Sequence, residues 1–192
     1  LETFNASAYD IPEATIVGPA ASGIDMPFID PFLKSGVLAY LDGVSVHPYR
    51  AGPPETAAAE YRILREKIDR YAPPGRKSPI AVVSGEWGYS SDGKDVSPER
   101  QAAYLVRQQL FNLHSGVPLS IWYDWKNDGP DPTEREQNFG TVHPDLTPKP
   151  AYLAVQTMTR ELAGFRVVAR FDTGREEDFV LVLTDAAGRT RL

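Results

Sequence analysis

The segment "VVSGEWGYSS", residues 82 to 91, places a carboxylate where a buried strand is expected to end. Val82 and Val83 are β-branched residues of the kind that fill a strand covered on both faces. Glu86 follows them at the point where such a strand would leave the core. A carboxylate in that position is either the partner of a cation or a reactive group, that is, a nucleophile or a proton carrier.

Two other apolar runs end in side chains suited to chemistry on a polar substrate. "VSVHPY" brings His47 and Tyr49 to its end, and "LSIWYDW" brings Trp122 and Asp124. The carboxyl ends of parallel strands meet at one edge of a sheet or on one face of a barrel. We therefore expect these four side chains to be neighbours of Glu86 in space, although tens of residues separate them along the chain.

Strands and helices that would position these residues alternate along the chain. Four short apolar runs are expected as strands, at residues 15–19, 44–48, 80–84 and 119–125. Segments with helical spacing of apolar residues lie between and after them. This alternation is typical of βα units around a parallel sheet, so the expected fold class is α/β.

Three helices are expected from apolar spacing and from start and stop residues. The first follows "AGPPE", and its apolar stripe consists of Tyr61, Leu64, Ile68 and Tyr71. The second begins at the N-cap residue Ser97, followed by Pro98, and ends before Gly116; its apolar residues include Leu105, Leu110 and Leu113. The third follows "TPKP", and its apolar face consists of Ala151, Val155, Met158 and Leu162. The segment between the first two strands is expected to hold only a short helix.

After Gly164 the pattern changes from helical spacing to strand alternation. "FRVVARFD" and "FVLVLTD" flank the turn-like "TGREED" and are expected to form an antiparallel hairpin. "AAGRTRL" is expected to form another turn leading into a strand. A second, all-β element is therefore expected to begin there.

The composition excludes several classes of protein. The chain has 192 residues, 42% of them hydrophobic, and a net charge of −6, which fits neither a disordered segment nor a nucleic-acid binder with a basic patch. It contains no cysteine, so there is no disulfide framework and no thiolate metal site. No apolar run is long enough to span a membrane. We expect one globular domain or slightly more.

Four parallel strands suit either a small open sheet or half of an eightfold barrel. An open nucleotide-binding sheet would carry a glycine-rich turn after its first strand, and "GPAASG" lacks the required spacing. Three of the four strand ends instead carry polar or aromatic residues, as the strands of a βα barrel do around an active site. We favour the half barrel, and an open-sheet α/β protein of another function is the less favoured alternative.

In this order and at this spacing, the strand ends resemble the C-terminal half of the clan A retaining glycoside hydrolases, and most closely those of family 39. "ATIVGPAASG" resembles the fifth strand of their (β/α)8 TIM barrel, "LDGVSVHPY" the sixth and "PIAVVSGEWGYS" the seventh. "IWYDWKNDG" with "EQNFGTVHPDLTPKPAY" resembles the eighth strand and its following loop. The resemblance implies that residues 1–164 form strands 5 to 8 with their helices. It also implies that residues 165–192 begin an accessory β-sandwich-like domain.

The resemblance implies a site for hydrolysis of β-linked oligo- or polysaccharides. Glu86 matches the seventh-strand carboxylate that attacks the anomeric carbon and forms a glycosyl-enzyme intermediate. Tyr49 and His47 match a sixth-strand pair of hydrogen-bond donors, with the Tyr49 hydroxyl holding one carboxylate oxygen. Trp122 matches the indole beneath the reacting sugar. The substrate-binding candidates are thus His47, Tyr49, Trp122, Trp87 and Trp125.

Each candidate also has a structural interpretation that the residues alone leave open. Glu86 could be an ion-pair partner, His47 a packing histidine, and Trp122 a core residue, since an indole carries a large apolar area. His114 and His143 have no spacing that suggests a metal site, so no metal is assigned and no cofactor is expected.

The chain lacks one component of the implied mechanism. A retaining glycosidase needs a second carboxyl group about 5 Å from the nucleophile to protonate the leaving oxygen. In this clan it belongs to an Asn-Glu pair after the fourth strand, and the chain contains no Asn-Glu. We therefore expect the nucleophile half of an enzyme, inactive by itself. Its expected partners are a carbohydrate substrate and either the N-terminal half of the barrel or another copy of the chain.

A non-catalytic carbohydrate-binding or scaffolding remnant of such a barrel is the alternative to the enzyme. No nucleic acid and no membrane span are expected. The resemblance implies a secreted or periplasmic location.

Overall fold

The computed structural model describes residues 14–76, 78–175 and 178–192. Four strands form one sheet in the order of the sequence: β1 (Val17–Ser22), β2 (Gly43–His47), β3 (Ala81–Trp87) and β4 (Ser120–Trp122). The pairings of β1 with β2 and of β2 with β3 are parallel. The predicted α/β class, with four βα units, is confirmed.

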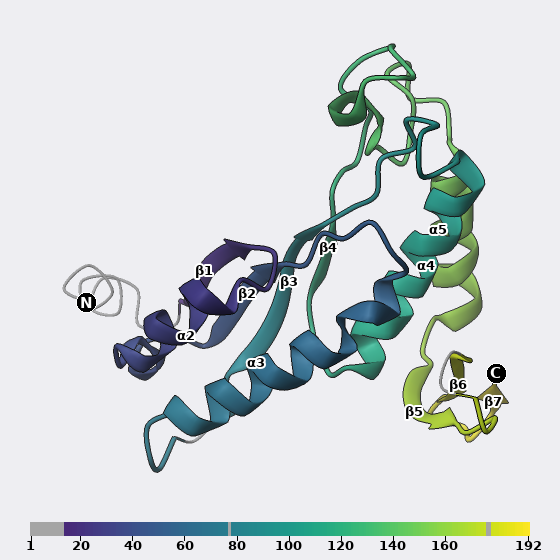
Figure 1. Ribbon diagram of the computed structural model, residues 1–192. Coiled ribbons are helices and arrows are strands. Elements are labelled where there is room, and N and C mark those ends of the chain that lie inside the picture. Colours follow the sequence, from purple (N-terminus) through teal and green to yellow (C-terminus); the bar gives the residue numbers. More distant parts are fainter. Residues whose placement is uncertain (1–13, 77, 176–177) are drawn as a thin grey trace. The chain divides into compact units, whose positions relative to one another are not determined.

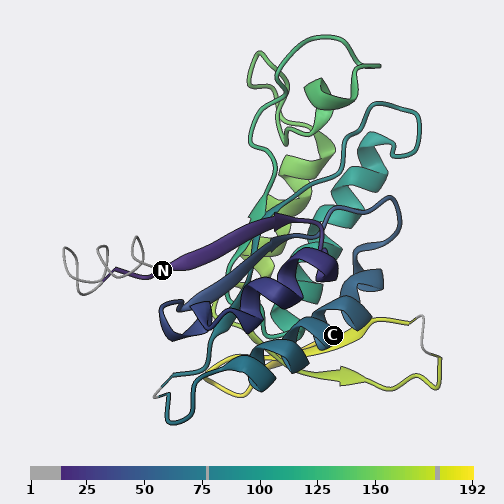
Figure 2. The same cartoon turned by 60° about the vertical axis from the view of Figure 1, so that its left-hand side comes forward.

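The chain divides into two compact units, and each is described by itself. The first contains β1, β2, β3 and the beginning of β4, with α2 (Met26–Lys34) and α3 (Ala58–Tyr71). It also contains the 3-10 turn η1 (Val37–Ala39) and the second half of η2 (Pro54–Ala57). The helices α2 and α3 lie next to each other (Figure 2). Tyr61, Leu64 and Ile68 are buried along one face of α3, as predicted.

The second unit is built on two long helices, α4 (Pro98–His114) and α5 (Pro150–Leu162), which pack side by side (Figure 1). As predicted, Ser97 caps α4, because its hydroxyl accepts a hydrogen bond from Arg100 N at 3.2 Å. Of the apolar residues named for this helix, Leu105 is buried together with Phe111, whereas Leu113 is 56% exposed.

A three-stranded antiparallel sheet follows α5. Its strands are β5 (Arg166–Phe171), β6 (Val180–Thr184) and β7 (Thr190–Arg191), in that order. The predicted hairpin and its third strand are confirmed. Leu181 and Leu183 face the core from β6. The division of the chain into a barrel half that ends at Gly164 and a separate β-domain remains a prediction.

The boundaries of β2 differ from the predicted ones by one residue, and those of the other three strands differ by more. The first strand begins at Val17 and runs to Ser22, instead of covering residues 15–19. The third continues to Trp87, so Glu86 lies within the strand and not just after it. The fourth ends at Trp122, so Trp125 belongs to the loop that follows. Apolar spacing alone does not locate these ends, because polar residues that still pair with a neighbouring strand continue the ladder.

Within the described residues, the helices are all too short or too polar to cross a membrane.

Candidate active site

Glu86 is the centre of a small polar cluster on the first unit. The hydroxyl of Tyr49 donates a hydrogen bond to Glu86 Oε1 at 2.7 Å. His47 Nδ1 lies 3.8 Å from Glu86 Oε2, which is longer than a hydrogen bond. The Glu86 side chain is 38% exposed. One carboxylate oxygen is thus held in place while the side chain remains accessible from solvent.

The strand register explains why these three residues meet. Val46 on β2 lies beside Ser84 on β3, so the residues that follow on each strand, His47 and Gly85, continue side by side. Just after β2 the chain turns sharply, since Tyr49 N donates to His47 O at 2.8 Å. This turn directs the Tyr49 side chain to Glu86. The predicted Tyr49–Glu86 contact is therefore present, whereas the catalytic roles of the residues remain predictions.

Gly85 is the residue that lets the imidazole and β3 approach each other. A Cβ at this position would overlap Ser45 Oγ and would lie 3.5 Å from His47 Nε2. The glycine in "SGEW" thus has a steric reason: the neighbouring strand fills the space that a side chain would need. The backbone that carries Glu86 is fixed by this packing.

Trp87 is completely buried, with 0% of its surface exposed. The guanidinium of Arg50 lies over its ring, with Cζ 5.4 Å from the ring centroid. A buried ring offers no face to a sugar, so these contacts favour a packing role. The assignment of Trp87 to substrate binding remains a prediction.

Trp122 and Trp125 belong to the second unit and differ in their surroundings. Trp122 is partly buried against a cluster of apolar residues on α4 and α5, among them Leu105 and Ala151. Its Nε1 donates to Phe139 O at 3.3 Å. These contacts favour packing over sugar stacking, and the role of Trp122 beneath a sugar remains a prediction.

Trp125 presents most of its ring to solvent, with 61% of its surface exposed. Its carbonyl accepts hydrogen bonds from Thr141 N at 2.9 Å and Val142 N at 3.2 Å. Its ring meets Tyr152 edge to face, with the centroids 5.9 Å apart. An exposed indole on a fixed backbone is the arrangement that stacking on a sugar ring requires.

Sequence reasoning missed the buried polar network that holds the loop after β4. Lys149 is only 2% exposed, and its Nζ donates to Asn127 Oδ1 and to Asn138 O, both at 3.0 Å. Gln101 on α4 donates from Nε2 to Asn138 O at 3.1 Å. No signal in "TPKP" indicates burial, because lysine is usually exposed.

Asp124 and Lys149 have altered proton affinities. Burial, and to a lesser extent the charge of Asp128, raises the pKa of Asp124 to about 6, although the charge of Lys149 opposes this shift. Burial lowers the pKa of Lys149 to about 8, with Asp124 opposing. Within the described part of the chain, Asp124 Oδ1 is buried without a hydrogen-bond donor. Asp124, expected near Glu86, lies on the second unit with Trp122 and Trp125.

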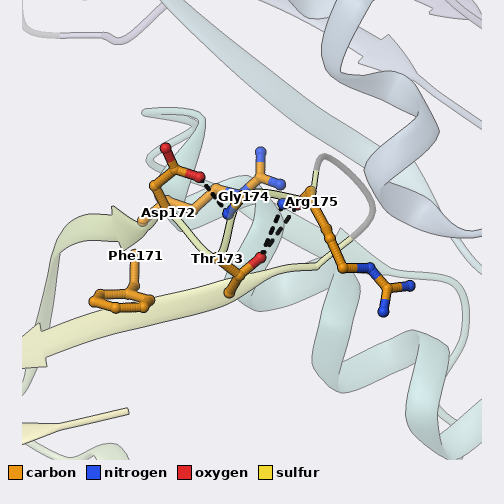
Figure 3. Close-up of a pocket in the computed structure, with 6 residues that line it drawn as sticks. Phe171, Asp172, Thr173, Gly174 and Arg175 are labelled. Atoms are coloured by element: carbon orange, nitrogen blue, oxygen red, sulfur yellow. Dashed lines mark hydrogen bonds between the residues drawn. The ribbon is translucent and has the colours of Figure 1, made fainter.

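A hollow of about 380 Å³ lies at the tip of the β5–β6 hairpin and contains none of the candidate residues (Figure 3). Asp172 Oδ1 accepts a hydrogen bond from Gly174 N at 2.8 Å, which closes the turn. Gly174 adopts a φ of 79°, a left-handed conformation that favours glycine. Hydrogen bonds join Asp172 to Gly174 and Thr173 to Arg175 within the turn. The described residues contain no cluster of three or more His, Asp or Glu suited to a metal.

Comparisons with known proteins identify what the chain resembles. No protein-family model matches it, and no curated protein does. Among solved structures it is similar to a family 39 glycoside hydrolase from the gut symbiont Bacteroides cellulosilyticus WH2, with 26% identity and a TM-score of 0.81 over 97% of this chain and 41% of that chain.

Two further structures show the same fold at lower identity. The first is a GH39 β-xylosidase from Caulobacter crescentus, with 19% identity and a TM-score of 0.58 over 96% of this chain and 37% of that one. The other is a glucosidase from Croceicoccus marinus, with 18% identity and a TM-score of 0.70 over 94% of this chain and 38% of that one.

The resemblance to family 39 that the strand ends predicted is confirmed. The chain spans 37% to 41% of the length of these three structures. Its four βα units form part of a (β/α)8 barrel, consistent with the C-terminal half, and a small antiparallel sheet follows them.

Proposed function

We propose that the chain is the nucleophile half of a retaining glycoside hydrolase that acts on β-linked sugars, with Glu86 as the nucleophile. The observation that carries this proposal is the hydrogen bond from Tyr49 to Glu86 Oε1, at a strand end in a fold similar to family 39 hydrolases. A carboxylate that attacks carbon must be ionised and aimed. The phenol donor holds one oxygen and leaves Oε2 as the attacking atom.

The reaction proceeds in two displacements. Glu86 Oε2 forms a bond to the anomeric carbon while the bond from that carbon to the leaving oxygen breaks, and an acid protonates the leaving oxygen. Water then attacks the same carbon, its proton passes to the conjugate base of that acid, and Glu86 is released. Two inversions give net retention. The acid is supplied from outside this chain, because the sequence contains no Asn-Glu pair.

The strand order also supports an assembly. Because β1 and β4 are the outer strands of the four, both have a backbone edge without a neighbouring strand among the described residues. Val17 on β1 and Ile121 on β4 expose apolar surface. These edges are covered by the other half of the barrel or by a second copy of the chain. Sedimentation of the chain as a stable compact monomer of 21.2 kDa would contradict this assembly.

Covalent labelling tests the nucleophile directly. The probes are 2-deoxy-2-fluoro-β-D-glucosyl fluoride and its xylosyl analogue, since the similar structures include a glucosidase and a β-xylosidase. Fluoride is a good leaving group that depends little on a proton donor, so labelling should proceed even where the acid is missing. Intact mass and peptide mapping should show one sugar on Glu86, both in this chain and in the protein that contains it together with the remaining barrel.

Two variants complete the test. Glu86→Gln should not be labelled, and Glu66→Gln, which alters an exposed carboxylate on α3 of the same unit, should be labelled like the parent. Labelling of another carboxylate would contradict the role of Glu86. Reversible binding of sugar without any adduct would support the non-catalytic binding remnant instead.

A further inference from the structure

We infer that Arg50 is a positioning residue for Glu86: together with Tyr49 it clamps the end of β3, and it thereby sets the angle at which the carboxylate faces the sugar. The inference rests on the proposed function in so far as that angle matters for catalysis. The contacts that form the clamp, from Tyr49 to Glu86 and from Arg50 to Trp87, do not depend on that function.

Arg50 is anchored on several sides. Its Nη2 forms an ion pair with Glu60 Oε2 on α3 at 2.7 Å, and its Nε donates to Pro48 O at 3.1 Å. Its Nη1 donates to Thr56 Oγ1 at 3.3 Å. The side chain is 12% exposed. A guanidinium held by a fork of hydrogen bonds has little freedom to move.

The fourth contact of Arg50 links its side chain to β3, the strand that carries Glu86. The guanidinium lies over the ring of Trp87, the residue directly after Glu86, with Cζ 5.4 Å from the ring centroid. A buried cation–π contact of this kind resists displacement of either partner. The position of Trp87 on β3 is therefore linked to α3 through Arg50.

Tyr49 and Arg50 are consecutive in the sequence, and they contact Glu86 and Trp87, which are also consecutive. Side chains alternate between the two faces of a strand, so Glu86 and Trp87 point in opposite directions. Their exposures agree with this, since Glu86 is 38% exposed and Trp87 is 0% exposed. Tyr49 contacts Glu86 on one face, and Arg50 contacts Trp87 on the other. Rotation of the strand end about its axis would break one contact or the other.

Such a clamp matters because nucleophilic attack tolerates little misplacement. A reacting atom held within about 0.5 Å of its productive position requires support from residues that are themselves locked. Tyr49 alone fixes one oxygen of Glu86, and the Nε bond of Arg50 to Pro48 O fixes the turn that carries Tyr49. Arg50 therefore acts on both partners of the Tyr49–Glu86 hydrogen bond.

The experiment compares Arg50→Met and Arg50→Lys with Arg65→Met. Arg65 is the matched control, because it is an arginine on α3 that also donates to a backbone carbonyl, that of Ile80 at 2.6 Å, just before the start of β3 and away from Glu86. Each variant is labelled with the two 2-fluoroglycosyl fluorides. The maximal labelling rate (kinact) and the half-saturating concentration (KI) are measured per folded molecule, and thermal unfolding is recorded.

Arg50→Met should lower kinact by about 10- to 100-fold while KI changes by less than about threefold, because the sugar still binds but the carboxylate is misaligned. Arg50→Lys keeps the charge but not the planar fork, so it should give an intermediate loss of kinact. Arg65→Met should lower the unfolding temperature and leave kinact within about twofold. An unchanged kinact in both folded Arg50 variants would overturn the inference.

A second measurement needs no substrate and separates this inference from the proposed function. The NMR signal of Tyr49 Cζ, assigned with Tyr49→Phe, reports the hydrogen bond to Glu86. Arg50→Met, or Arg50→Lys if the first does not fold, should shift this signal in the same direction as Glu86→Ala, and Arg65→Met should not. If the Arg50 variant shifts the Tyr49 signal but the parent protein is not labelled by the probes, the clamp is retained and the proposed hydrolase function is rejected. An unmoved signal would reject the clamp.

Discussion

Gly85 on β3 lies against Ser45 on β2 so closely that a methyl group at Gly85 would overlap the serine hydroxyl. The two strands can adopt this separation only because one of the two residues has no side chain. Glu86 is the next residue on β3, so any displacement of Gly85 moves the carboxylate. The packing of two small residues therefore determines where the candidate nucleophile lies.

Gly85→Ala should destabilise the protein by about 1–3 kcal/mol, because the new methyl group has to push β2 and β3 apart. Labelling of Glu86 should slow by more than the folded fraction explains. Denaturant unfolding and kinact with the fluoride probes measure the two effects.

The matched rescue is Gly85→Ala combined with Ser45→Ala. Removal of the hydroxyl removes the overlap, and the remaining neighbour, His47 Nε2, would lie at an ordinary contact distance of 3.5 Å. The double variant should recover most of the stability and rate lost in the single one. Equal losses in the single and double variants would show that the overlap is not the cause.

Trp122→Ala and Trp125→Ala should separate packing from sugar binding. Trp122→Ala should cost about 2–4 kcal/mol of stability, because it leaves a cavity against α4 and α5, and labelling per folded molecule should be retained. Trp125→Ala should leave the unfolding temperature nearly unchanged and raise KI at least about fivefold, because an exposed stacking face is lost. Thermal unfolding and labelling kinetics of both variants measure these effects. A drop in kinact for well-folded Trp122→Ala would indicate instead that Trp122 lies beneath the reacting sugar.

Lys149→Met should destabilise the protein by about 1–3 kcal/mol. Methionine fills a similar volume but cannot donate a hydrogen bond. Asn127 Oδ1 therefore loses the donor Lys149, whereas Asn138 O keeps those from Ser91 N and Gln101, and a buried acceptor without a donor is costly. Lys126→Met is the control, because this lysine is exposed in the same loop, and it should change stability by less than about 0.5 kcal/mol. Urea unfolding of both variants decides whether the buried ammonium stabilises the loop.

Asp124→Asn should change the pH dependence of stability. The pKa of Asp124 is raised from 3.8 to about 6 in the folded protein, so its stabilising contribution is complete below pH 3.8 and is lost as the pH rises through 6. Asparagine does not titrate, so the stability of the variant relative to the parent should rise between pH 4 and 6. Urea unfolding across this range measures the slope.

Asp131→Asn provides a comparison of opposite sign. Hydrogen bonds from Thr133 lower the pKa of Asp131, so its stabilising contribution is present above the usual carboxyl range and is lost in acid. The stability of this variant relative to the parent should therefore fall as the pH rises. The same sign of slope in both variants would contradict the assignment for Asp124.

Much of the fold could be predicted because the local signals agree with the tertiary structure. Ser97 and Pro98 begin α4, and the stripe from Tyr61 to Ile68 is buried on α3. The strand ends at His47 and Glu86 could be paired because parallel strands align their carboxyl ends. The contact between Tyr49 and Glu86 follows from that alignment and a tight turn.

The other features could not be predicted, because they depend on contacts between residues that are far apart in the sequence. The identity of the exposed tryptophan could not be predicted, because the end of β4 at Trp122 is set by pairing and not by composition. Arg50 and Lys149 are cations of a kind that is usually exposed, and only the assembled structure shows the partners that bury them. Their positions therefore emerge from tertiary contacts.

The sheet order follows the order of synthesis, and this has a consequence for how the protein is made. Each of the strands β2 to β4 pairs with the strand translated just before it, so none of them has to wait for a later segment to find its neighbour. Domains assemble progressively as the chain leaves the ribosome. The partners of the Tyr49–Glu86 hydrogen bond are both present once Trp87 has emerged, before α4 and the small sheet have been translated. The candidate nucleophile Glu86 can therefore meet Tyr49 co-translationally, on β1 to β3 and the turn after β2.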